Sequence, residues 1–177
     1  SVLAFSIGWA PILFGILRDS NPQDTLAKLF RMYTITLISF AYVLALLTPE
    51  LISVLGPPAY AAAKDVSPIL CVAYVVYGLF IFFLSGVVVT GKFQYQSLAL
   101  IVGAASNAVL NFVLIPVYGL IGAACATLAA YTVTAYAGFR FAQRLYPIPY
   151  QWRDLFSVGC AAVLGYILYV LVLQLGM

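Results

Sequence analysis

Long apolar segments alternate with short polar connections along the whole chain. The apolar segments cover residues 2–17, 32–48, 67–90, 96–115, 117–139 and 155–175. Each is close to the roughly 20 residues that a helix needs to cross the hydrocarbon core of a bilayer. Because hydrocarbon supplies no hydrogen-bond partners, the backbone must bond within each segment, which predicts six helices.

Composition supports this interpretation. Of the 177 residues, 65% are hydrophobic and only 7% are charged, and the mean hydropathy is +1.10. A soluble domain carries about a quarter of its residues charged. We therefore expect an all-α, polytopic transmembrane helical bundle of about six spans.

The few basic residues indicate how this bundle is oriented. When the connections are assigned alternately to the two sides, seven basic residues share one side: Arg18, Lys28, Arg31, Lys92, Arg140, Arg144 and Arg153. Lys64 alone lies on the other side. The positive-inside rule makes the first side cytoplasmic. The net charge of +3 thus reflects orientation, and without a clustered basic stripe nucleic acid is not an expected partner.

Enzymatic chemistry has little support in the sequence. The chain has no histidine, and its five carboxylates are scattered over connections rather than paired: Asp19, Asp24, Glu50, Asp65 and Asp154. Cys71, Cys125 and Cys160 lie in apolar segments without metal-ligand spacing, and we expect them to be buried packing residues. We therefore predict no catalytic residue, no metal and no cofactor.

Asn107 and Asn111 are the most unusual polar positions. They are four residues apart and hence share a helix face, and the uncharged turn at 116–119 predicts an antiparallel hairpin of segments 96–115 and 117–139. Two interpretations stay open for this amide stripe. It forms interhelical hydrogen bonds, or it lines a hydrated cavity that binds substrate.

Further candidate substrate-binding residues lie in the first segment and at the basic side. Pro11 is expected to kink the first segment next to Trp9, either as a structural feature or as the border of a substrate path. Arg18 and Arg31 are expected to anchor the helices at the interface. The alternative is that they attract an anionic headgroup or a pyrophosphate at the cytoplasmic mouth.

Four stretches in order along the chain resemble one family: "APILFGILRD", "LLTPELISVLGPPAYAAAKDVSPIL", "GVVVTGK" and "SNAVLNFVLIPVYGLIGAACATLAAY". They resemble the C-terminal half of the polysaccharide flippases, the Wzx or polysaccharide-transporter branch of the multidrug/oligosaccharidyl-lipid/polysaccharide exporter superfamily. Nearly the whole chain is covered, and the asparagine-bearing stretch is the most specific part.

The resemblance implies one bundle of a two-bundle fold that works by alternating access. The implied activity is translocation of undecaprenyl-pyrophosphate-linked oligosaccharide across the bacterial cytoplasmic (inner) membrane for surface polysaccharide biosynthesis. It also implies as partners the lipid-linked oligosaccharide, membrane lipids, the polysaccharide polymerase machinery and an N-terminal bundle of the same polypeptide. The chain begins at Ser1 without an initiator methionine, and we expect it to be part of a longer protein.

Two alternatives to the flippase interpretation remain open. One is a drug or small-solute exporter of the same superfamily, and the other is a membrane component of polysaccharide assembly that does not itself transport.

Overall fold

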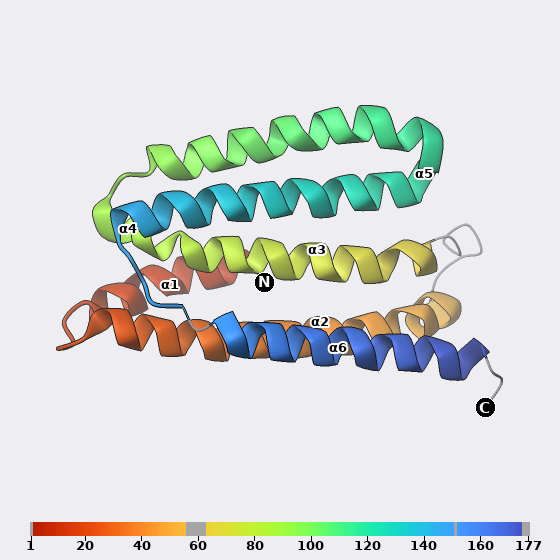
Figure 1. Cartoon of the computed structure of the whole chain (residues 1–177), viewed down its shortest axis with the longest axis horizontal. Helices are drawn as coiled ribbons and strands as arrows, with labels where there is room; N and C mark the ends of the chain where they lie inside the picture. Colours follow the sequence, from red (N-terminus) through yellow and green to blue (C-terminus); the bar gives the residue numbers. More distant parts are fainter. Residues whose placement is uncertain (1, 56–62, 151, 175–177) are drawn as a thin grey trace.

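A computed structural model describes residues 2–55, 63–150 and 152–174 of the chain (Figure 1). The described residues form helices and no strands. The helices are α1 (Val2–Ile16), α2 (Pro22–Leu55), α3 (Ala63–Phe83), α4 (Ser85–Thr90), α5 (Gln94–Leu145) and α6 (Trp152–Gln174). Residues 56–62 of the second family-like stretch, and residue 175 of the last predicted segment, lie outside the described residues.

The pattern of side-chain exposure is that of a membrane protein. Large apolar residues face outward, among them Phe112 with 84% of its surface exposed and Val54 with 79%. Many interior positions carry small residues instead, such as Ala73, Ala99 and Ala126, which are fully buried. Small residues inside let helix backbones approach closely, which is how helices associate in hydrocarbon.

Three helical stretches of the described chain are long and apolar enough to cross a membrane. They are Pro22–Thr48, Ala63–Thr90 and Gln94–Leu145. The chain is therefore that of an all-α membrane protein. Two of the six predicted segments fall below this criterion: α1 has 15 residues, and the described apolar stretch of α6 covers Phe156–Tyr166.

Helix α5 is folded back on itself at Gly119. This residue has φ 55° and ψ −128°, a conformation open to glycine and strained for other residues. We call residues 94–118 the first arm and residues 120–145 the second arm. Figure 1 shows the arms running side by side in opposite directions. The predicted hairpin of segments 96–115 and 117–139 is thus confirmed.

The remaining helices pack around the second arm and α2. Helix α3 packs most extensively against α5 and next against α2, whereas α6 packs mainly against α2. The predicted span 67–90 lies within the membrane-length stretch Ala63–Thr90, which is divided at Leu84 into α3 and α4 although the backbone of Leu84 stays helical. The short helix α1 rests on α2 and α4. Together the long helices lie roughly parallel to one axis in Figure 1.

Gly103 holds the two arms of α5 together. A Cβ atom at this position would lie 1.8 Å from the Thr134 hydroxyl oxygen, and Thr134 itself is buried. A side chain at residue 103 therefore requires Thr134 to change its rotamer, and a large one also requires the arms to move apart.

We accordingly predict that Gly103→Val lowers the thermal unfolding temperature of the full-length protein in detergent, with a cost of about 1–3 kcal/mol from overpacking. The matched control is Ala104→Val on the next position of the same arm, which is exposed. Equal unfolding temperatures for the two variants would contradict the close approach of the arms.

Candidate functional site

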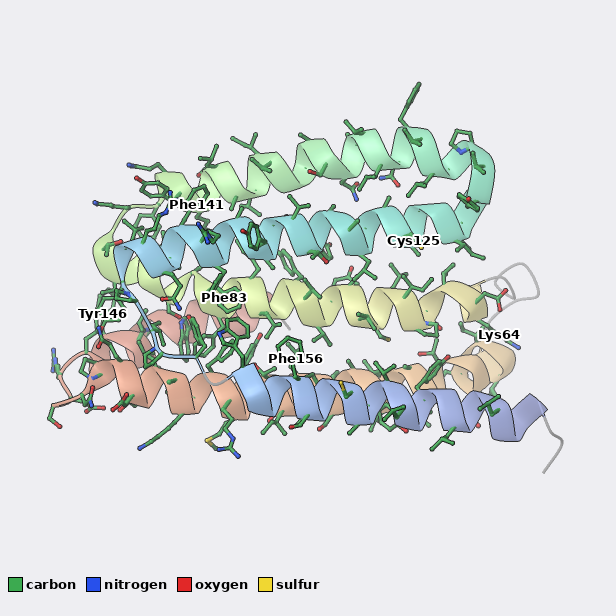
Figure 2. All side chains as sticks on the ribbon, in the orientation of Figure 1. Lys64, Phe83, Cys125, Phe141, Tyr146 and Phe156 are labelled. Carbon is green, nitrogen blue, oxygen red and sulfur yellow. The ribbon has the colours of Figure 1, made fainter. Side chains whose placement is uncertain are left out.

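Basic residues gather at one end of the bundle, which we call the basic end. Arg18 follows α1, Lys28 is near the start of α2, and Arg144 is in the last turn of α5. Lys64 begins α3 at the opposite end, and Figure 2 labels it far from Tyr146. Arg18 and Arg31 are both exposed at the basic end. The structure thus separates Arg18, Lys28, Arg31 and Arg144 from Lys64, as predicted for these four residues (Figure 1 and Figure 2).

A cluster of rings fills the interior behind these charges. At its centre is Phe30 of α2, which is fully buried. The centroid of its ring lies 4.4 Å from that of Tyr150 and 5.1 Å from that of Phe82. Phe83 and Trp9 complete the aromatic cluster, which is therefore contributed by α1, α2, α3 and the α5–α6 connection. Offset and tilted contacts of this kind add to the apolar burial.

The α5–α6 connection is held in place by Gln143. Its side-chain amide donates to the carbonyl oxygen of Ile148 at 2.8 Å, and its side-chain oxygen accepts from the amide of Ile148 at 2.9 Å. Ile148 lies between two prolines and outside any helix, so its backbone N–H and C=O have no helical partners. The two bonds from Gln143 satisfy both groups. It also directs Ile148 and Tyr150 into the aromatic cluster.

Trp9 lies inside this cluster and not at an open surface. Its indole N–H donates to the Ser85 hydroxyl oxygen at 2.9 Å, and that hydroxyl donates to the carbonyl oxygen of Phe82 at 2.6 Å. Ser85 begins α4 just after the break at Leu84. The Trp9 side chain thus attaches α1 to the break between α3 and α4, while Pro11 beside it is exposed.

The two candidate asparagines bond to one another. The Asn111 amide nitrogen donates to the Asn107 side-chain oxygen at 2.8 Å, and both residues are half-buried on the first arm. This bond lies within one helix, so it is not the interhelical bond considered from the sequence. Gly103 lies opposite Thr134. Because the arms are antiparallel, four residues forward on the first arm correspond to four residues back on the second. In this register, Asn107 therefore lies opposite Ala130, and Asn111 lies opposite Ala126.

The position of the amide pair follows from that register. Ala126 and Ala130 on the second arm are both buried, and their small side chains leave the two amides room at the seam between the arms. The bond between the amides uses one N–H of Asn111 and one acceptor site of Asn107. The Asn107 amide nitrogen and the Asn111 side-chain oxygen retain capacity for further bonds.

An apolar crevice lies between α3 and α6, away from the candidate residues, and residues of α2 also line it. Its volume is about 430 Å³. The lining residues are Ile38, Ala41, Tyr42, Ala45, Pro68, Ile69, Cys71, Val72, Val75, Leu128, Gly159, Ala162, Val163 and Tyr166. Sequence reasoning did not identify this crevice. The available signal was the recurrence of Ala41 and Ala45 on α2 and of Gly159 and Ala162 on α6, at helical spacing.

The candidate residues thus occupy three separate places: the amide pair on the first arm, Trp9 in the aromatic cluster, and Arg18 and Arg31 at the basic end. The described residues contain no group of three or more metal-ligating side chains. The expectation that the cysteines are buried is wrong for Cys125 and Cys160, which are exposed, and Cys71 is half-buried. Outward-facing apolar positions suit a thiol here because the surroundings are lipid.

Comparison with known proteins adds no relative to this picture. The chain matches no model of a protein family, no curated protein and no solved structure. Its functional assignment therefore depends on its own residues and geometry.

Tyr150 carries a buried hydroxyl that has no hydrogen-bond partner among the described residues. Burial raises the pKa of this phenol above its usual value of 10.0. In the unfolded chain the phenol ionises at the usual value, so folding stability is retained below about pH 10 and falls as the pH rises further.

We predict that Tyr150→Phe leaves stability at neutral pH unchanged or raises it by about 1 kcal/mol, because no hydrogen bond is lost. Above about pH 10 the variant loses less stability than the parent protein. Thermal unfolding between pH 7 and pH 11 measures both effects, with exposed Tyr118→Phe as the control. A neutral-pH loss of several kcal/mol would show that the hydroxyl has a partner.

Proposed function

We propose that this chain forms one bundle of a transporter that moves undecaprenyl-pyrophosphate-linked oligosaccharide units across the bacterial cytoplasmic membrane. In this proposal, α1, α2, α3 with α4, the two arms of α5, and α6 provide the six spans. The basic end faces the cytoplasm, and the transporter alternates access between this bundle and a second one.

The observation that carries the proposal is the Asn107–Asn111 pair. Two amides within an apolar hairpin are costly unless they meet polar groups, and their mutual bond leaves a donor and an acceptor for another partner. Sugar hydroxyls both donate and accept hydrogen bonds, so they match what the pair offers. The pair also lies in the stretch where the resemblance to flippases is most specific.

The distribution of charge supports transport of an anionic head group. Arg18, Lys28 and Arg31 are exposed at the basic end, which faces the cytoplasm in the proposed orientation. Guanidinium and ammonium groups there attract a pyrophosphate before it enters the membrane. Transport of this kind moves the substrate without covalent chemistry, so the proposal assigns no general acid or base.

We predict that changing Asn107 and Asn111 together to leucine reduces polysaccharide export at least about ten-fold, because the substrate loses hydrogen bonds worth about 1.5 kcal/mol in total. Export is measured by complementing a flippase-deficient bacterial strain with the full-length protein. The amount of protein in the membrane fraction should stay unchanged.

The matched control is Thr132→Leu on the second arm. Thr132 is exposed, and its hydroxyl donates to the carbonyl oxygen of Leu128 in its own helix at 2.8 Å, so its only donor is already used. Normal export by the double asparagine variant would refute a role for the amide pair. Export of a small cationic drug in place of polysaccharide would favour an exporter of the same superfamily.

A further inference from the structure

We propose that the apolar crevice between α3 and α6 binds one acyl chain of a membrane phospholipid, whose phosphate lies near Lys64. This site is separate from the amide pair, and it does not depend on which substrate the protein transports. The argument uses the shape of the crevice, its depth along the helices and the one basic residue at its end of the bundle.

The crevice exists because small residues on its walls are not filled by neighbours. A Cβ atom added to Gly159 would meet nothing within 4 Å, although this glycine lines the crevice. At Gly165, six residues further along α6, the same atom would lie 2.8 Å from the Tyr42 hydroxyl oxygen. Helix α6 therefore contacts α2 closely on one face and leaves space on the face that carries Gly159.

The dimensions of this space fit a hydrocarbon chain. Its lining runs from Ile38 to Ala45 on α2 and from Gly159 to Tyr166 on α6, which corresponds to roughly 10 Å along each helix. A further transmembrane helix would need a groove along the whole hydrocarbon thickness of about 30 Å. The lining is apolar, so a sugar or a charged head group placed there would lose its hydrogen bonds to water.

Position along α3 identifies the leaflet from which the chain enters. The lining residues Pro68 and Cys71 lie in the first half of α3, which begins at Ala63, and Val75 lies just past its midpoint. The crevice is therefore nearer to the Lys64 end than to the basic end. A lipid in the leaflet at the Lys64 end reaches it with its chain while its phosphate stays at the membrane surface.

Lys64 is placed to meet that phosphate. It precedes Pro68 by four residues and Cys71 by seven, so it lies on the face of α3 that lines the crevice. Figure 2 shows Lys64 at this end of the bundle. The neighbouring Asp65 is exposed and turned by about 100° around the helix, and it reduces the net charge without occupying the same face. The other seven basic residues belong to the opposite end.

A bound chain would complete the packing of α6. This helix packs mainly against α2, and the crevice separates it from α3. Hydrocarbon in the gap restores the dispersion contacts that the facing walls otherwise lack. The lipid is thus expected to act as a structural part of the bundle.

Cys71 provides a direct test because its thiol lines the crevice, whereas Cys125 and Cys160 are exposed. The full-length protein is purified in a steroid-based detergent, which has no acyl chain to compete. The reaction rate of each cysteine with N-ethylmaleimide is then measured during titration with dioleoyl phosphatidylglycerol. At ten times its dissociation constant, the lipid should slow the reaction of Cys71 about ten-fold. The rates at Cys125 and Cys160 should not change.

Two variants separate the contributions of the chain and the phosphate. Ala162→Phe fills the crevice and should abolish the effect of lipid on Cys71. Lys64→Gln should raise the lipid concentration needed for half-maximal protection about three- to five-fold, and the control Lys28→Gln at the basic end should leave it unchanged. If the phenylalanine variant does not fold, the titration of the parent protein and of Lys64→Gln still decides the question.

Three results would overturn the proposal. The first is a Cys71 rate that the phospholipid does not alter. The second is equal protection of all three cysteines, which indicates coating of the surface and not occupation of the crevice. The third is protection by a polyprenyl phosphate at concentrations at which the phospholipid has no effect, because the occupant would then be an isoprenoid chain.

Discussion

Close approach of helix backbones at small residues is the constraint on which the rest of this structure depends. In lipid, apolar side chains gain little by leaving the surface, so helices associate through close packing and not through the hydrophobic effect. Gly103 against Thr134 sets the spacing of the two α5 arms, and Gly138 against Phe80 does the same for α5 and α3. Along the first arm of α5, large apolar residues face outward, as the exposure of Phe112 shows. The outer surface is therefore apolar and suited to contact with lipid.

The two ends of the bundle differ in how completely they are packed. At the basic end, rings from three helices and the α5–α6 connection meet around Phe30, and Gln143 fixes the connection that completes them. Toward the Lys64 end, α3 and α6 separate and the crevice opens. For the alternating-access transport proposed above, such a difference matters, because a rigid end and a more loosely packed end would respond differently to movement of the bundle. We expect the aromatic cluster to be the most rigid part of this bundle.

The sequence predicted the class of the fold and its hairpin well, because both depend on local patterns. Apolar length and composition gave the helices, and the turn before Gly119 gave the antiparallel arms. The hydrogen bond between Trp9 and Ser85 was not predicted, because the two residues are 76 positions apart in the sequence. The burial of Trp9 and the crevice were not predicted for the same reason, because both depend on which helices pack against each other. Helical spacing placed Asn107 and Asn111 on one face, but it did not indicate that they bond to each other.

The turn at Gly119 has a consequence for biosynthesis. Its neighbours Val117, Tyr118 and Leu120 carry no charge, and the arms on both sides are apolar. Moving an ionised group through hydrocarbon costs several kcal/mol, whereas this turn exposes only a few backbone groups during its passage. The two arms are therefore able to enter the bilayer from the insertion machinery as one prefolded loop, with their tip leading and their charged ends left behind.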